Sequence, residues 1–283
     1  MSNHNGRDFT NELYAGVATG ALCITLLPQK QSIWLDASEK EKISDVLQEH
    51  QDTNVYLGLC HSSAPKTAYQ RTTRESASAF PAVVVDIDVF NPDAHAQKDL
   101  PPTKEEAREF LNALELPEPS AVIDTGNGLQ AFWFLDNPLL LSDEETKKKA
   151  ERLSFGINEV VISEGRKRGW KFDNVGDLAR IVRAPDTMNM KGETPKPTKV
   201  LELSKSRYSY DELASYLPKT ETADTIAFTC FEKEVSVSDK KADFQAVFAA
   251  CGFMRHWVEE AKSCLSHFGT TVYRWLDLSL IHI

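Results

Sequence analysis

The sequence predicts an α+β fold for this chain of 283 residues. Several runs are rich in β-branched and aromatic residues and are typical of strands, and several capped segments carry apolar residues at helical spacing. The composition, with 41% hydrophobic and 26% charged residues, is that of a globular protein. A chain of this length buries a core without disulfides, and its five scattered cysteines, which form no C-x-x-C pair, indicate reduced thiols and a cytoplasmic protein.

The N-terminal part predicts strands on both sides of one helix. Residues 17–35 contain two apolar runs separated by a turn at Pro28, which predicts two strands. Ser38 and Glu41 form a capping-box pattern, which predicts a helix over about residues 39–50. The run NVYLGLC that follows predicts a further strand at 54–60.

The middle of the chain alternates strands with capped helices. PAVVVDIDVF at 81–90 is the most strand-like run, and a capping box that begins at Thr103 predicts a helix after it. Residues 120–135 predict two strands around a glycine turn, and a third capping box begins at Ser142. A strand at 199–203 and a short helix with the sequence SYDELASYL complete this part.

The formal net charge is −10, from 32 Lys and Arg against 42 Asp and Glu. This balance excludes a protein that is coated in positive charge, so any phosphate-binding surface is local. Two stretches are basic: residues 66–74 contain three cations and no acid, and residues 166–199 contain nine cations and four acids. No apolar stretch is long enough to cross a membrane, so no membrane partner is expected.

The run VVVDIDVF places Asp86 and Asp88 on one strand. Because strand side chains alternate, both carboxylates point to one face, while Val83, Val85 and Ile87 point to the other, toward the core. Adjacent carboxylates repel each other unless a cation lies between them, and Mg²⁺ or Mn²⁺ prefers such oxygens. The pair predicts a divalent-metal site, and a solvated pair on an exposed strand face is the alternative.

A glycine turn, TGNG at 125–128, separates the two strands predicted over 120–135. Small residues let backbone N–H groups approach a ligand such as phosphate. Gln130 follows on the same face as Phe132 and Phe134. The turn is a candidate ligand-binding loop, and an ordinary hairpin turn is the alternative.

The third feature is the basic segment KFDNVGDLARIVRAPDTMNMK at 171–191. Asp177 is a candidate N-cap for a short helix that carries Arg180 and Arg183 on one face, and arginine forks match phosphate oxygens. A solvated basic face that balances the acidic remainder is the alternative. Together, paired carboxylates, a glycine turn and an arginine cluster are the components of metal-assisted phosphoryl or nucleotidyl transfer.

The order and wording of these motifs resemble the archaeo-eukaryotic primase superfamily, in its branch of primase-polymerase domains from phages, plasmids and bacterial mobile elements. The matching segments are VVVDIDVF, DTGNGLQAFW and FDNVGDLARIVRAPDTMNMK, and the resemblance covers about residues 15–205. It implies an RRM-like antiparallel catalytic sheet packed against an N-terminal α/β unit, in a primase-polymerase domain over 1–217. A linker at 218–240 and a helical extension at 241–283 are expected to follow.

The resemblance implies a DNA primase and DNA polymerase that carries out template-directed nucleotidyl transfer in the replication of a phage, plasmid or mobile element. It implies that Asp86, Asp88 and Asp173 hold two Mg²⁺ or Mn²⁺ ions, with Asp177 as the second choice for the third ligand. The implied NTP- or dNTP-binding residues are Thr125, Asn127, Gln130, Arg180, Arg183, Asn189 and Lys191.

The implied partners are a single-stranded DNA template and primer, with a replicative helicase as a further partner. Arg71 and Arg74 are candidate contacts to template or primer phosphates, and a plain solvated loop is the alternative for them. Two positions depart from the family pattern. Gln130 stands where many members have a histidine, and Asp186 replaces the glycine of the P-G-T motif.

Two other functions remain open at this point. A D-x-D nucleotide-sugar glycosyltransferase shares the metal carboxylates, although it leaves the segment ARIVRAP and the N-x-K motif unexplained. A catalytically silent replication initiator or DNA-binding module on a primase scaffold is the other, and the retained acids argue against it. Incorporation of labelled nucleotides, compared with labelled sugars, separates these functions.

Overall fold

The computed structural model of the protein describes residues 5–92 and 98–218, which belong to a unit of residues 1–219. The expected helical extension at 241–283, and the expected linker from residue 219 on, lie outside the described residues. The described elements are α1 (Gly6–Leu13), β1 (Ala21–Leu27), β2 (Gln31–Asp36), the 3₁₀-helix η1 (Ala37–Lys42), α2 (Ile43–Glu49), β3 (Asn54–Gly58), β4 (His61–Ser62), β5 (Ala77–Asp88), α3 (Lys104–Asn112), β6 (Ala121–Asp124), β7 (Gly128–Leu140), α4 (Glu144–Lys167), β8 (Ile181–Arg183), β9 (Met188–Asn189), β10 (Lys196–Pro197), β11 (Lys199–Leu203), β12 (Arg207–Tyr208) and α5 (Tyr210–Ala214).

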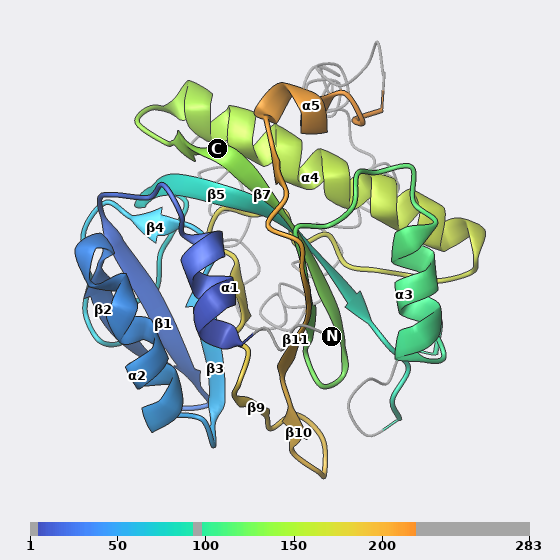
Figure 1. The fold of residues 1–283 in the computed structure, drawn as a ribbon, viewed down its shortest axis with the longest axis horizontal. Coiled ribbons are helices and arrows are strands. Elements are labelled where there is room, and N and C mark those ends of the chain that lie inside the picture. Colours follow the sequence, from blue (N-terminus) through green and yellow to red (C-terminus); the bar gives the residue numbers. More distant parts are fainter. Residues whose placement is uncertain (1–4, 93–97, 219–283) are drawn as a thin grey trace, which may run out of the picture. The chain divides into compact units, whose positions relative to one another are not determined.

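Ten strands form one sheet in the order β11-β6-β7-β5-β4-β1-β3-β8, with β2 beside β1 and β12 beside β7 (Figure 1). All of its pairings are antiparallel except that of β12 with β7. The predicted α+β class and the antiparallel sheet are therefore confirmed. The N-terminal unit does not form a separate layer: the short strand β4 pairs with both β1 and β5, so both parts share one sheet.

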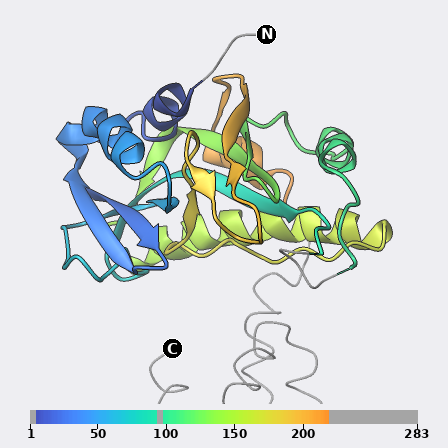
Figure 2. The same cartoon turned by 90° about the horizontal axis from the view of Figure 1, so that it is seen from below.

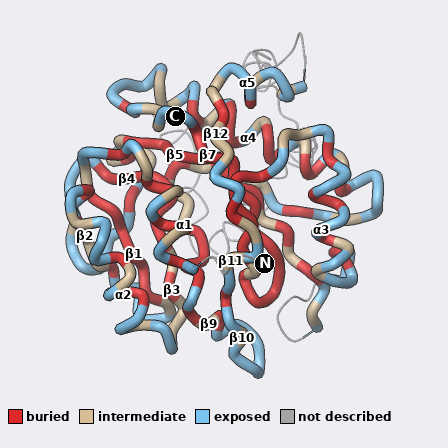
Figure 3. The backbone as a smooth tube through the Cα atoms, viewed as in Figure 1, coloured by how far each residue is buried: buried red, intermediate tan, exposed pale blue. Residues whose placement is uncertain are grey.

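Different helices lie on the two faces of the sheet at β5 and β7, α4 on one and α1 on the other (Figure 2). Val83, Val85 and Ile87 are buried on the side of α4, as the strand alternation predicts, and the Asn158 amide of α4 donates to the Val84 carbonyl. On the other face, the Phe9 ring of α1 packs edge-on against Phe132 and tilted against Phe134 of β7, with centroid separations of 5.1 and 6.2 Å. Figure 3 shows the buried backbone of the central strands β5 and β7 between these helices.

Two of the three predicted helix caps differ from the observed ones by one or two residues. Thr103 caps α3 as predicted, since its hydroxyl accepts from the backbone of the first turn. Asp36 rather than Ser38 caps η1, and Asp143 rather than Ser142 caps α4. In both corrected cases the aspartate has extended backbone angles, so its carboxylate reaches the exposed N–H groups of the first turn. None of the helices in the described ranges combines the length and apolar character that a membrane crossing requires.

His61 is a buried titratable group where β4 joins the two parts of the sheet. It is 2% exposed and its ring packs edge-on against Tyr14 at a centroid distance of 5.0 Å. Its Nδ1 has no hydrogen-bond partner in the described part of the chain. Burial lowers the pKa of His61 to about 4, because the charged ring would lose its water, and the Lys40 charge adds to this effect. The folded core therefore holds a neutral imidazole.

Acid should destabilise the protein through this residue. A free histidine has a pKa near 6.5, so the unfolded chain takes up the proton first as the pH falls toward 4, and stability is lost over that range. We expect His61 to lower the free energy of unfolding by on the order of 2 kcal/mol between pH 7 and pH 5. Urea unfolding at both pH values checks this: His61→Phe should lose less stability than the wild type, and equal losses would contradict the assignment.

Candidate functional site

Asp86 and Asp88 lie at the carboxyl end of β5, on the face away from α4. They pair across the ladder with Gln130 and Gly128 of β7, and both carboxylates are only partly exposed. The register places the Gln130 side chain on the same face as the two acids, because directly paired residues point the same way. The structure therefore brings these three predicted site residues together.

Arg183 faces these carboxylates from β8, at the end of the sheet. The predicted short helix carrying Arg180 and Arg183 is wrong, because residues 181–183 form a strand that pairs with β3. Asp177 does not cap a helix: its carboxylate accepts from the Arg180 guanidinium at 2.5 Å. The two arginines therefore do not share a helix face, yet both of their charges act on Asp86.

The Gln130 amide connects the two sides of the site. Its Oε1 accepts from the Arg183 backbone N–H at 3.0 Å, and its Nε2 lies 3.4 Å from Asp86 Oδ2. The first contact uses the only acceptor of the amide, which directs the NH₂ group toward the carboxylate. Gln130 is 6% exposed, so this orientation is held in a largely dry environment.

The Arg183 guanidinium is also buried, at 6% exposure. It donates to Asn54 Oδ1 at 2.7 Å and to Asn189 Oδ1 at 2.8 Å, and it lies 4.3 Å from the centre of the Tyr56 ring. Burial lowers the pKa of Arg183, although an arginine stays protonated at neutral pH. Sequence reasoning missed Asn54 and Tyr56, since neither stands out within a strand.

The negative charge of Asp86 is unfavourable in the folded protein. Burial and the Asp88 charge raise the pKa of Asp86 to about 7, against the opposing effects of the Gln130 hydrogen bond, Arg180 and Arg183. A net increase in pKa means that these opposing contacts do not offset burial and the neighbouring carboxylate at Asp86. A divalent cation would relieve this repulsion, and two carboxylates together with water and substrate phosphates are a usual ligand set for Mg²⁺. The two residues therefore fit a Mg²⁺ or Mn²⁺ ion.

Within the part of the chain that the structure describes, no third acid joins Asp86 and Asp88. The described residues contain no group of three or more His, Cys, Asp or Glu placed to hold a metal. Asp173 is exposed and lies in a segment packed along α4. Next to it, Phe172 packs against Gly165, and the Asn174 amide donates to the Phe155 carbonyl. These anchors hold Asp173 beside the helix that covers the opposite face of the sheet, so the predicted three-carboxylate arrangement is not formed.

The glycine turn is held by polar side chains that sequence reasoning assigned to the nucleotide. Thr125, Asn127 and Asn189 are each at most 5% exposed. Asn127 Oδ1 accepts from Lys196 Nζ at 2.8 Å, its amide donates to the Lys191 carbonyl, and Asn189 donates to the Thr125 carbonyl at 2.6 Å. These bonds fix the turn to the β9–β10 hairpin. Sequence reasoning missed Lys196 because it lies outside the N-x-K motif.

Gly128 allows the turn to approach the carboxylates closely. A Cβ atom there would lie 2.4 Å from the Ile87 carbonyl oxygen and 2.9 Å from Asp88 Cα. Gly126 has a φ of 89°, which favours glycine, and its N–H donates to the Asp124 carboxylate at 2.7 Å. Gly128 thus allows β5 and β7 to pair closely at the site, and Gly126 allows the turn between β6 and β7.

The two predicted nucleic-acid contacts differ in their surroundings. The Arg74 guanidinium donates to the carboxylates of Glu144 and Glu151 on α4, over 2.5–3.0 Å. Two carboxylates neutralise its charge, which leaves it poorly suited to bind phosphate. Arg71 is exposed in the same loop.

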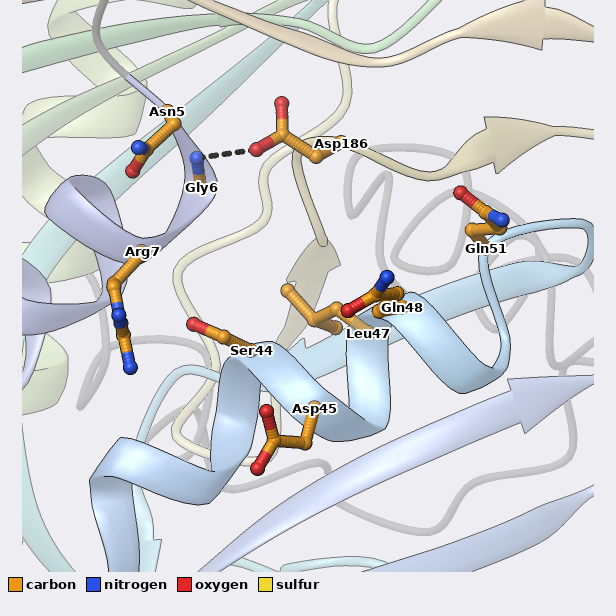
Figure 4. A pocket seen from close by; sticks show the side chains of 9 residues that line it. All are labelled: Asn5, Gly6, Arg7, Ser44, Asp45, Leu47, Gln48, Gln51 and Asp186. Carbon is orange, nitrogen blue, oxygen red and sulfur yellow. Dashed lines mark hydrogen bonds between the residues drawn. The ribbon is translucent and has the colours of Figure 1, made fainter.

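A cavity of about 360 Å³ lies between α1 and α2, lined by polar residues that Figure 4 shows. At its edge the Asp186 carboxylate accepts from the Gly6 N–H at 2.6 Å. Asp186 has a φ of 61°, so it adopts the left-handed conformation that the missing glycine would allow. A second cavity, of about 250 Å³, also borders Asp186. Neither cavity is lined by Asp86 or Asp88, so neither belongs to the carboxylate face.

No protein-family model matches the sequence, and no curated protein matches it. Among solved structures, the fold is similar to the AEP domain of the cyanophage S-2L primase-polymerase, with 13% identity and a TM-score of 0.46 over 74% of this chain and 95% of that chain. It is also similar to the catalytic domain of the primase RepB′ in complex with initiator DNA, with 14% identity and a TM-score of 0.44 over 82% and 100% of the two chains. For a further RepB′ structure the values are 14% and 0.43, over 93% and 76%.

The carboxylate pair should make stability depend on pH. Because the pKa of Asp86 is raised to about 7 in the folded protein, the unfolded chain loses this proton first, and the free energy of unfolding falls as the pH rises from about 4 to 7. We therefore expect Asp86→Asn to be more stable than the wild type at pH 8 by on the order of 1 kcal/mol, with no advantage at pH 4. Urea unfolding in EDTA measures this difference.

Adding Mg²⁺ at pH 8 provides the control, because it should stabilise the wild type and leave Asp86→Asn unchanged. If the wild type were more stable than Asp86→Asn in EDTA at pH 8, this would contradict the raised pKa of Asp86.

Proposed function

We propose that the chain is a metal-dependent nucleotidyltransferase of the primase-polymerase kind, a DNA primase and DNA polymerase that serves the replication of a phage, plasmid or mobile element. The observation that carries this proposal is the pair Asp86 and Asp88 on one strand face, with two arginine charges acting on it from outside the strand. Such a pair suits the binding of a divalent cation together with a polyphosphate. The motif order described above supports the choice of polymerisation among the reactions of this class.

Asp86 and Asp88 would hold the metal ion through carboxylate oxygens. A bound Mg²⁺ or Mn²⁺ supplies activation of the attacking 3′-hydroxyl and charge stabilisation of the leaving pyrophosphate. The role of the protein is to fix the two carboxylates on a paired strand, so that their positions change little on binding. Because β5 pairs with β7 up to Gly128, the carboxyl end of the strand is not a free loop.

Arg180, Arg183 and Lys191 would bind the triphosphate. Arg183 contacts only neutral oxygens and an aromatic face through its guanidinium in the described residues, so its charge is not cancelled by an ion pair. Arg180 shares its charge with Asp177. Lys191 is exposed, and its backbone N–H is fixed by Asn189 Oδ1 at 3.0 Å. The charges of Arg180 and Arg183 act on Asp86, and the backbone of Lys191 is fixed beside the glycine turn through Asn127.

Thr125, Asn127 and Asn189 would then act on the nucleotide through the shape of the turn. The Asn127 side chain donates to the Lys191 carbonyl and the Asn189 side chain of β9 donates to the Thr125 carbonyl, so the backbone of the turn is the part that would face the ligand. The substrate would be an NTP or dNTP on a primed single-stranded DNA template, and a replicative helicase is a further expected partner. Gln130 would hold the carboxylate and the arginine strand in register.

The metal carboxylates are tested by primer extension. We expect Asp86→Asn and Asp88→Asn to lower nucleotide incorporation with Mg²⁺ or Mn²⁺ by at least about a hundredfold, because each removes a charged metal ligand. Incorporation of labelled dNTPs and NTPs on a primed and on an unprimed template measures it, and circular dichroism checks the fold. Full activity in either variant would rule out the metal assignment.

Asp173→Asn is the matched control, and it should keep its activity because Asp173 lies beside α4. Labelled nucleotide sugars, offered in parallel, should not be transferred. Sugar transfer, or template binding without incorporation by the wild type, would favour one of the two other functions.

Gln130 is tested by two substitutions. Gln130→Leu leaves the buried Arg183 N–H without an acceptor and should lower the free energy of unfolding by about 1–3 kcal/mol. Gln130→His retains an acceptor and should bind a nucleotide as tightly as the wild type or more tightly. Urea unfolding and a nucleotide titration by fluorescence measure these effects. A large loss of nucleotide affinity in Gln130→His would argue against the bridging role, because the histidine ring also supplies an acceptor for the Arg183 N–H.

A further inference from the structure

Arg183 is buried more deeply than any other lysine, arginine, aspartate or glutamate among the described residues, at 6% exposure. A buried charge is unfavourable unless an opposite charge or a set of hydrogen bonds compensates the loss of water. Two other arginines have an opposite charge beside them: Arg180 pairs with Asp177, and Arg74 pairs with two glutamates of α4. In the described structure the Arg183 guanidinium contacts only neutral groups, so these must compensate its charge in another way.

Three uncharged side chains surround this guanidinium: Asn54, Tyr56 and Asn189, which we call the neutral cradle of Arg183. Asn54 and Asn189 each accept one hydrogen bond from it through Oδ1, at 2.7 and 2.8 Å. The guanidinium lies over the Tyr56 ring, with Cζ 4.3 Å from the ring centre. Tyr56 is directly opposite Arg183 on the β3–β8 ladder, and Asn54 lies two residues before Tyr56 on the same face of β3. The pairing of the strands therefore assembles the cradle.

The two amides of the cradle are themselves fixed by further hydrogen bonds. Asn54 Oδ1 also accepts from the Met190 N–H at 2.9 Å, and Asn189 Oδ1 also accepts from the Lys191 N–H at 3.0 Å. The Asn189 amide donates to a carbonyl of the glycine turn at 2.6 Å. The cradle thus connects Arg183 to β9, to the segment that follows β9 and to the turn beside the carboxylates.

The contacts of the cradle leave the charge and most of the donors of Arg183 available. A guanidinium has five N–H groups, and its hydrogen bonds to the described residues use two of them. A neutral acceptor or an aromatic face stabilises a cation without cancelling its charge. The backbone N–H of Arg183 is bound by Gln130, whose amide reaches Asp86, and the charges of Asp86 and Asp88 act on the guanidinium. A triphosphate bound with a metal ion at the two carboxylates would therefore lie within reach of these donors.

We propose that Asn54 and Tyr56 are positioning residues of the carboxylate site, which hold Arg183 among uncharged groups so that its full charge acts on the triphosphate of the incoming nucleotide. The proposal rests on the nucleotidyl transfer proposed above and identifies the residues that form its phosphate subsite. The substitution Asn54→Asp would offer an oxygen to the same two N–H groups, yet it would cancel the charge of Arg183. The amide at this position therefore serves phosphate binding as well as folding.

The test uses the full chain and titrates dATP in MgCl₂, without DNA, by isothermal calorimetry. Asn54→Asp keeps an acceptor for Arg183 and Met190 and adds an opposite charge, so it should bind dATP at least about tenfold more weakly. Its urea midpoint of unfolding should equal or exceed that of the wild type, because the new carboxylate pairs with Arg183. A role of Asn54 in folding alone predicts unchanged affinity. The loss should be the same for dTTP, because the cradle acts on phosphates and on no base.

Asn137→Asp is the matched control, since it adds the same charge at an exposed position toward the other end of β7. It should bind dATP like the wild type. The ring is tested by a pair of variants: Tyr56→Phe keeps the aromatic face and should bind like the wild type, whereas Tyr56→Leu removes it and should bind about fivefold to tenfold more weakly. Thermal unfolding checks that each variant is folded.

A double-mutant cycle shows whether Asn54 acts through Arg183. In the background of Arg183→Gln, the charge that Asn54→Asp would cancel is already absent. Adding Asn54→Asp to this background should therefore change the affinity for dATP by less than about twofold. An equal loss in both backgrounds would mean that the added carboxylate repels the nucleotide directly, and it would overturn the proposal.

Equal affinity for dATP in the wild type and Asn54→Asp would also overturn the proposal, and so would equal losses in Asn54→Asp and the Asn137→Asp control. Equal losses in Tyr56→Phe and Tyr56→Leu would overturn the role of the ring. Primer extension separates these results from the proposed function. If the wild type incorporates nucleotides and Asn54→Asp binds dATP normally, the cradle is wrong and the function stands. If Asn54→Asp loses affinity while the wild type incorporates nothing, the phosphate subsite stands and the function is wrong.

Discussion

The amide of Gln130 is the interaction on which the polar face of this protein depends. The sheet runs from β11 to β8, and the backbone N–H of Arg183 on the last strand is satisfied by a side chain rather than by another strand. The same amide reaches Asp86 from β7. One neutral side chain therefore sets the position of an arginine strand relative to a pair of carboxylates, although the two come from opposite parts of the sheet.

A neutral bridge has an electrostatic consequence that a direct ion pair would not have. In the described structure Arg183 and Asp86 form no ion pair, so neither charge is cancelled at short range. Burial then raises the pKa of the carboxyl and lowers that of the guanidinium. Among the described residues, Asp86 and Arg183 therefore each lack an ion-pair partner of opposite charge. A ligand that carries a dication and a polyanion together would satisfy both, which explains why a fold would tolerate such an arrangement.

The sequence predicts the long strands of the site better than its short strand and connecting segments. The alternation around Asp86 and Asp88 is a local property, so their shared face and the core face of β5 were predictable. The short strand at 181–183 was mistaken for a helix, because three residues carry no periodic signal and the pairing with β3 is distant in sequence. The family resemblance implies that Asp173 joins the two acids, but the neighbouring Phe172 is anchored to α4, and a packing contact of this kind is not visible in a sequence motif.

The same distinction applies to positive charge. The role of a cation depends on the residues that it contacts, and the number of cations in a segment does not reveal it. Arg74 stands in the basic loop, yet Glu144 and Glu151 of α4 neutralise it across 70 and 77 positions, a pairing that no local pattern reveals. Arg183 is enclosed by amides and a ring. The cations at 166–168 lie on the surface at the end of α4. In a chain of net negative charge, screening confines the effect of each such charge to its own neighbourhood.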